Sequence, residues 1–416
     1  MYKNSRLIKI FSTLFFLIGG KIYAQQELNA ITTAVPFLLI APDSRAGGMG
    51  DAGVAASPDG NSIHWNPSKL AFIKEDMGFS LSYIPWLRSL VPDINLSYLS
   101  GYKRLDNNQT IAASLFYSSL GDITFTDQSG MTIGNYRPNE FAFDLAYARK
   151  LSPNFSGGMA LRYIYSNLTM GQVVGGADTR PGMSVAADIS GYYVNPDAQL
   201  GNIPATVAFG LNISNIGSKM SYSGTGRRDF IPINMRLGPS ITLKPDDYNS
   251  ITFVFDAVKL LVPTPPITDP LDNNRIIAGS DPDVGIAAGM FGSFSDAPGV
   301  PVKDEDGNRV FMDDGTLQIE KGSVFKEELR EINMSLGMEY WYDKQFALRV
   351  GYFHEHSSKG NRKFVTFGAG LKYNVFGLDL AYIVPTVQRH PLANTLRFTL
   401  TMNFAAVKSD KGSGNL

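Results

Sequence analysis

The sequence predicts an all-β fold, a 14-stranded antiparallel transmembrane β-barrel with an N-terminal plug segment in the lumen and long extracellular loops. Three observations lead to this prediction. The chain begins with an export signal, it then divides into segments in which apolar and polar residues alternate, and the connections between these segments alternate in length. A closed barrel is one of the two structures that satisfy every backbone group inside a bilayer.

The export signal is a predicted signal peptide at residues 1–24, cleaved after Ala24. A basic start with Lys3, Arg6 and Lys9 precedes an apolar core at residues 10–20, as in secretory signals. No later apolar run approaches the roughly eighteen residues that a membrane-spanning helix needs. The sequence contains no cysteine, which excludes disulfides and thiol chemistry. Its 38 acidic and 37 basic residues nearly cancel, so no nucleic-acid partner is expected.

The alternating segments are the predicted strands. In the last one, Leu396, Phe398 and Leu400 share one face, whereas Arg397 and Thr399 share the other. The first face suits lipid and the second suits a wet lumen. The barrel is expected over residues 77–404, with strands at 77–86, 93–104, 109–120, 140–151, 155–168, 182–194, 205–217, 232–244, 249–262, 332–343, 345–357, 364–374, 376–386 and 395–404.

The connections are short after most even-numbered segments, with turn sequences such as LDNN, SPN and PDDY. After the odd-numbered segments they are longer, and the longest is residues 263–331. Short turns on one side and long loops on the other are typical of outer-membrane barrels, in which the short turns are periplasmic. We therefore expect an integral protein of the cell outer membrane with both termini periplasmic, including a C-terminal tail at residues 405–416, and with extracellular long loops.

Residues 25–76 precede the first strand and are expected to plug the lumen. They contain GMGDAG at residues 48–53, which matches the G-x-G-x-x-G pattern of dinucleotide-binding loops. Pro42 separates these glycines from the preceding apolar run, and Pro58 and Pro67 leave no room for the helix that should follow. No cofactor is therefore expected, and the glycines are interpreted as sites where the backbone passes close to the barrel wall. The expected plug residues are Asp43, Arg45, Gly47, Gly48, Gly50, Asp51, Gly53, Asn66 and Pro67.

Charged residues on the lumen faces of the strands are expected to line the interior. Some of them should meet charges of opposite sign on Asp43, Arg45 and Asp51 of the plug. No serine, histidine and acid are grouped as in a hydrolase, so the sequence predicts no catalytic residues and no enzymatic activity. The predicted lumen-lining residues are Asp144, Arg162, Asp256, Arg349 and Arg397.

The long connection at residues 263–331 is expected to be folded. Short helices are predicted within residues 281–294 and 325–332, with exposed hairpins between them around two Asp-Gly pairs. Phe291, Phe294 and Phe325 are candidate extracellular contacts for protein partners, because aromatic residues are favoured at the centres of interfaces. The alternative is that each of them packs within the loop.

Two patterns suggest metal sites, and a plainer interpretation is favoured for both. His354 and His356 share one face of a strand, but no third ligand lies nearby in the sequence, so a polar barrel rim is expected. Residues 303–315 are acidic like a calcium loop, but Arg309 and Gly315 occupy the positions that need glycine and glutamate. A solvated turn is expected there, and no metal.

Residues 41–71, APDSRAGGMGDAGVAASPDGNSIHWNPSKLA, resemble the N-terminal region of FadL-like outer-membrane proteins. The resemblance is closest to the PorV (LptO) family of the type IX secretion system, and FGSFSDAPG and FKEELREI in the long loop share it. It covers essentially the whole mature chain, although residues 300–322 are less typical of the family.

The resemblance implies a plugged barrel that acts in protein secretion without being an enzyme. The expected partners are a giant outer-membrane translocon barrel, cargo proteins with a type IX C-terminal signal domain, and the attachment complex, whose protease or sortase anchors cargo to lipopolysaccharide. Membrane lipids and lipopolysaccharide are further expected contacts. Two other functions remain open: a FadL-like transporter of hydrophobic small molecules, and a lipopolysaccharide deacylase that would depend on His354 and His356.

Overall fold

The structure is a computed structural model. It describes residues 28–405 except for 89–90, 127–128, 174–176, 225, 227, 388–390 and 394. The predicted signal peptide and nearly all of the predicted C-terminal tail lie outside the described residues.

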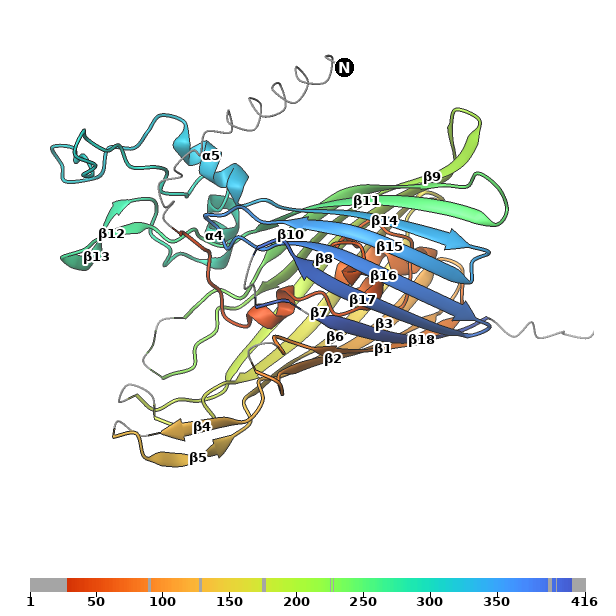
Figure 1. The fold of residues 1–416 in the computed structure, drawn as a ribbon, viewed down its shortest axis with the longest axis horizontal. Coiled ribbons are helices and arrows are strands. Elements are labelled where there is room, and N and C mark those ends of the chain that lie inside the picture. The colour runs from red at the N-terminus through yellow and green to blue at the C-terminus, as the bar shows by residue number, and fades with distance from the viewer. Residues whose placement is uncertain are drawn as a thin grey trace, which may run out of the picture.

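Fourteen antiparallel strands of the described chain close into a barrel, in which β1 pairs with both β2 and β18 (Figure 1). Closure leaves no strand edge unpaired, as a sheet in lipid requires. The strands of the barrel are β1 (Met77–Pro85), β2 (Asn95–Arg104), β3 (Gln109–Ser119), β6 (Asn139–Lys150), β7 (Phe155–Asn167), β8 (Gly182–Leu200), β9 (Ile203–Gly217), β10 (Asn234–Leu243), β11 (Asn249–Leu260), β14 (Asn333–Tyr342), β15 (Phe346–His354), β16 (Lys363–Tyr373), β17 (Phe376–Pro385) and β18 (Leu396–Phe404).

These strands confirm the predicted barrel. The largest difference is at β8 and β9, which continue as a paired hairpin up to Leu200 opposite Ile203, where a loop was expected. The predicted alternation of faces is also present, since Phe398 and Leu400 are 39% exposed on the outside, whereas Arg397 and Thr399 are each 1% exposed inside. An apolar outer face and a polar inner face are what a membrane barrel needs.

We call the end of the barrel that carries the connection between β11 and β14 the loop end, and the end where β2 turns into β3 the turn end. The connection between β11 and β14 is called loop 5 here. It holds the hairpin β12 (Ile267–Asp269) and β13 (Asp272–Ala278) and the helices α4 (Ile286–Gly292) and α5 (Ser323–Arg330). The β12–β13 hairpin was not expected, and neither was the hairpin β4 (Ile123–Thr126) and β5 (Thr132–Tyr136) between β3 and β6.

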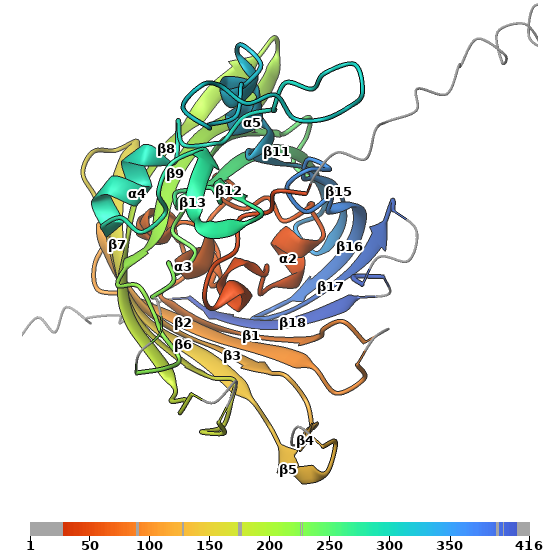
Figure 2. The same ribbon diagram turned by 90° about the vertical axis from the view of Figure 1, so that its left-hand side faces the viewer.

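The N-terminal segment, residues 28–76, runs through the interior of the barrel. Figure 2 looks into the barrel from the loop end and shows α2 (Ser44–Gly47) and α3 (Ser62–Trp65) inside the ring of strands. Two 3-10 helices, η1 (Pro36–Leu39) and η2 (Pro67–Phe72), complete the segment. No helix in the described part of the chain is long and apolar enough to cross a membrane.

The described N-terminal segment runs from one end of the barrel to the other. Near its start, Asn29 donates its backbone N–H to the carbonyl of Ser358 between β15 and β16, at the loop end. At its finish, the backbone N–H of Asp76 donates to the carbonyl of Phe404 at the turn end. The two ends of the described chain therefore lie at opposite ends of the barrel and not at the same end, because the segment traverses the lumen once before β1 begins.

Candidate functional site

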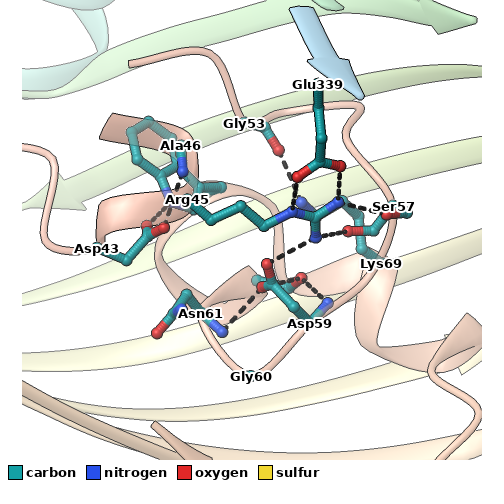
Figure 3. Close-up of polar contacts among 12 residues, drawn as sticks. Asp43, Arg45, Ala46, Gly53, Ser57, Asp59, Gly60, Asn61, Lys69 and Glu339 are labelled. Atoms are coloured by element: carbon teal, nitrogen blue, oxygen red, sulfur yellow. Dashed lines mark hydrogen bonds and ion pairs between the residues drawn. The ribbon is translucent and has the colours of Figure 1, made fainter. Parts of the chain in front are cut away.

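Arg45 is the centre of the ion network between the N-terminal segment and the wall (Figure 3). Its Nε and Nη2 donate to the two carboxylate oxygens of Glu339 in β14 at 2.9 and 2.8 Å, and its Nη1 donates to Asp59 at 2.9 Å. Glu339 also accepts a 2.7 Å bond from Arg349 in β15, which reaches Asp379 in β17 at 2.7 Å. Bidentate, charge-assisted bonds of this kind are strong and directional.

Two further lumen residues hold the glycine-rich turn. Asp256 in β11 accepts the backbone N–H groups of Gly53 and Val54 through Oδ2, at 2.9 and 3.0 Å. Arg397 in β18 donates from Nη1 to Asp51 at 2.6 Å. The turn that resembles a phosphate-binding loop therefore gives its N–H groups to a carboxylate of the wall.

The remaining predicted lumen residues, Asp144 and Arg162, lie elsewhere. They pair with each other at 2.6 Å, and Arg162 also contacts Asp188 at 3.2 Å and Asn215. This cluster joins β6, β7, β8 and β9 to one another. Sequence reasoning did not single out Asp188, Glu339 or Asp379, although each lies at an inward position of its strand and could have been found by the same alternation.

The other predicted plug residues are also placed inside the barrel. Asp43 caps α2 by accepting from the N–H of Ala46 and also accepts from the Trp65 indole at 2.6 Å. Asn66 caps η2, in which Pro67 is the first residue, and donates to the carbonyls of Val54 and Gly191. Gly47, Gly48 and Gly53 are buried around these contacts.

The backbone of the N-terminal segment passes close to the wall at Gly50, whose φ of 69° is left-handed. On the wall, a Cβ added to Gly351 of β15 would lie 2.0 Å from the Gly50 nitrogen and 2.1 Å from the Met49 carbonyl carbon. Only glycine leaves room for this approach. The close fit and the ion network together hold residues 43–72 against several strands.

At the loop end, a buried group of charges, the loop-5 ion cluster, attaches loop 5 to the barrel. Lys259 of β11 contacts Glu328 and Glu331 at 2.9 and 2.7 Å, and Lys359 contacts Glu327 and Glu331 at 2.6 and 2.9 Å. Three carboxylates thus meet two ammonium groups. Burial raises the pKa of Glu328 above its ordinary value. A proton bound to Glu328 would remove the excess negative charge of the cluster.

Helix α5 is consequently turned with its acidic residues inward. Glu327 and Glu328 are each 6% exposed, whereas Phe325 and Leu329, one turn apart, are 68% and 50% exposed. The two other predicted contact residues also reach the surface, since Phe291 is 78% and Phe294 is 48% exposed. Exposed large apolar residues gathered on a folded loop are typical of interaction surfaces.

The two patterns that suggested metals have local hydrogen-bond partners. His356 Nδ1 lies 2.9 Å from the Ser358 hydroxyl, and Glu355 accepts two bonds from the Arg362 guanidinium. Asp304 accepts the N–H groups of Asp306 and Asn308 in a hairpin turn. No group of three or more metal-ligating His, Cys, Asp or Glu side chains occurs among the described residues.

A cavity of ≈ 370 Å³ lies at the loop end, between the N-terminal segment and the wall. Leu39 and Ile40 of the segment face Phe353, Phe364 and other apolar residues across it. Charged groups, including Arg397 and Arg362, line it as well. The cavity is therefore amphipathic rather than purely apolar.

Comparison with known protein families decides the identity of this plugged barrel. The model of the family described as type IX secretion system protein PorV matches residues 23–267. The chain belongs to the PorV family. It is thus an outer-membrane component of the type IX secretion system. The match includes the N-terminal segment and the strands up to β11 but ends within loop 5, before α4 and α5.

Comparison with solved structures finds chains that are similar to this PorV-family protein. The Pseudomonas putida toluene transporter TodX has 11% identity and a TM-score of 0.50, over 92% of this chain and 100% of that chain. A Pseudomonas aeruginosa FadL homologue has 11% identity and a TM-score of 0.43, over 91% and 100%. A search of curated protein sequences found no match.

Proposed function

We propose that this PorV-family protein is a non-enzymatic carrier. It binds the C-terminal signal domain of secreted cargo at the translocon, a giant outer-membrane barrel, and shuttles it to the attachment complex with its protease or sortase. The observation that carries the proposal is the construction of loop 5, in which buried ion pairs hold α5 so that Phe325 and Leu329 face outward. Membrane lipids and lipopolysaccharide surround the barrel in this proposal.

The proposed orientation puts the loop end outside the cell and the turn end in the periplasm. The long, folded connections support it, because short periplasmic turns and longer extracellular loops are the pattern of outer-membrane barrels. In this orientation the first described residues, near Asn29, are extracellular, and the C-terminal end of β18 faces the periplasm.

The test replaces Phe325 and Leu329 together by serine and measures recovery of cargo C-terminal domains with the tagged protein from native outer membranes. An apolar residue at the centre of an interface contributes about 2 kcal/mol or more to binding. The affinity for the cargo domain should therefore fall roughly 30-fold, and less cargo should be recovered. The control is Phe311→Ser, which changes a 53% exposed phenylalanine between α4 and α5 in the same loop. If the double variant is folded and recovers cargo as well as the parent does, α5 is not part of the cargo-binding surface.

The second candidate is a transporter of hydrophobic small molecules, and the cavity between the N-terminal segment and the wall favours it. Its ≈ 370 Å³ lies in the range of small-molecule sites, which is roughly 300–1,000 Å³. Mass spectrometry of the protein purified from its own membrane tests this function. A bound hydrophobic compound that is lost in a Leu39→Glu variant would support the transporter, and a barrel without such a compound would count against it.

A further inference from the structure

The first residues of the N-terminal segment occupy a groove between three connections at the loop end. We call residues 28–34 the strap; they have no regular secondary structure. The Asn29 N–H donates to the Ser358 carbonyl at 2.8 Å, and the Ala34 N–H donates to the Phe230 carbonyl at 2.9 Å. The Asn29 side chain donates to the Pro265 carbonyl and to Glu327, at 3.3 and 3.2 Å.

The four hydrogen-bond acceptors of the strap indicate which chemical groups the groove can bind. Three of the four acceptors are backbone carbonyls, and the fourth is a carboxylate of the loop-5 ion cluster. Such a groove accepts main-chain N–H groups and one donor side chain, as a peptide-binding site does. It is built from loop 5, from the connection between β9 and β10 and from the connection between β15 and β16.

The strap differs from the rest of the N-terminal segment in how it is held. Residues 43–72 are attached by the ion pairs of Arg45 and Asp51, whereas the strap is attached by the hydrogen bonds of Asn29 and Ala34. Thr32 is exposed and lines two cavities, of ≈ 370 and ≈ 440 Å³. Departure of the strap would therefore join the two cavities.

Val35, which follows the strap, stores strain. Its φ of 47° and ψ of 52° are left-handed, although it is β-branched and only 1% exposed. Such a conformation is costly and persists only where the surroundings impose it. This left-handed residue marks the junction between the strap and the buried part of the N-terminal segment.

We propose that the strap is a built-in ligand of a peptide groove, and that an unstructured segment of a protein partner occupies the same groove when the strap leaves. The partner's segment presents main-chain N–H groups and a donor side chain at the position of Asn29. The inference rests on the proposed function only for the identity of this partner, a segment of the secreted cargo. Because Glu327 belongs to both the groove and the loop-5 ion cluster, binding on loop 5 and occupancy of the groove are physically connected.

The test uses a fluorescent peptide with the strap's own sequence, LNAITTA, and the detergent-purified protein. Fluorescence anisotropy should show saturable binding to a variant that lacks residues 28–34 and at least tenfold weaker binding to the full chain. A peptide carrying Asn29→Ala should bind the deleted variant several-fold more weakly. The control peptide carries Thr32→Ala, which changes an exposed side chain and should bind as the parent does.

A full-length variant keeps the test decisive if the deletion prevents folding. Asn29→Ala with Ala34→Pro removes the side-chain donor of Asn29 and the backbone donor of Ala34, three of the strap's four hydrogen bonds, without shortening the chain. This variant should bind the peptide more tightly than the parent protein does. The proposal would be wrong if a folded variant did not bind the peptide, or if the variant and the parent protein bound the peptide equally well. Peptide binding by a protein that recovers no cargo C-terminal domains from native outer membranes would leave the groove in place and reject the carrier.

Discussion

Arg45 and Glu339 form a bidentate ion pair inside the barrel, with Nε to Oε2 at 2.9 Å and Nη2 to Oε1 at 2.8 Å. The pair joins a four-residue helix to a strand that lies 294 residues later in the chain. A helix of one turn has little stability of its own. Its position in the lumen therefore depends on such contacts with the wall.

The first prediction concerns this pair. Arg45→Ala leaves Glu339 buried with one guanidinium partner in place of two, and loss of one member of a buried pair costs about 3–5 kcal/mol. Because Arg349 still contacts Glu339, we expect the lower end of that range, measured as a fall in the thermal unfolding temperature in detergent. Arg137→Ala is the control, since its pair with Asp122 is exposed, and exposed pairs contribute little to stability. Equal effects of the two variants would contradict the role of the network.

The second prediction concerns the close approach at Gly351. Gly351→Ala puts a methyl group against the backbone of Gly50 and Met49, so the N-terminal segment must shift. We expect a loss of about 1–3 kcal/mol, as for other overpacked sites, and faster cleavage of the segment by an added protease. Gly191→Ala in β8 is the matched control, because its Cβ would meet only the Phe155 ring at 3.5 Å. If the protease cleaves the N-terminal segment of the Gly351→Ala protein no faster than that of the parent, the contact at Gly351 does not hold the segment in place.

The third prediction concerns the attachment of loop 5. Lys359→Met keeps the length of the side chain but leaves Glu327 without its ammonium partner. Limited proteolysis should cut loop 5 at least tenfold faster, which corresponds to ~1.4 kcal/mol of lost local stability, whereas unfolding of the barrel should change little. Lys326→Met on the exposed side of α5 serves as the control. Cleavage at the parental rate in the Lys359→Met protein would mean that other contacts hold the loop.

The fourth prediction is a pH dependence of the same attachment. Burial raises the pKa of Glu328 above its ordinary value of 4.5, so the attached loop binds a proton more tightly than the released loop. The contribution of Glu328 to the attachment should therefore be fully present below its ordinary pKa and be lost as the pH rises through the raised pKa. Because the chain lacks cysteine, a spin label on Lys326→Cys reports loop mobility without other changes. Glu328→Gln should flatten the profile, and a rise in mobility on acidification would contradict the assignment.

The strands show how far sequence reasoning reaches. The alternation of Leu396, Arg397 and Phe398 is a property of neighbouring residues, so β18 and its two faces could be predicted from a short stretch. The same rule could have indicated that Glu339 points inward. It could not indicate that Glu339 meets Arg45, because the lumen brings together residues that are distant in the sequence.

Helix α5 was predicted to within two residues, but the sequence did not show which side of it faces the barrel. An apolar stripe usually turns inward, whereas here Phe325 and Leu329 face outward. The reason is that Lys259 in β11 and Lys359 in the connection between β15 and β16 attract the acidic side of the helix. Their meeting depends on the closed order of the strands.

By itself, the sequence determined the strand count, the two faces of the barrel wall and the family resemblance, because each of these depends on neighbouring residues or on a contiguous motif. Only the tertiary structure decided that the N-terminal segment starts at the loop end and crosses the lumen once, and that loop 5 presents an apolar helix face. These features arise where the closed barrel brings charges and backbone groups from distant strands within bonding distance. Local periodicity carries no information about such pairs.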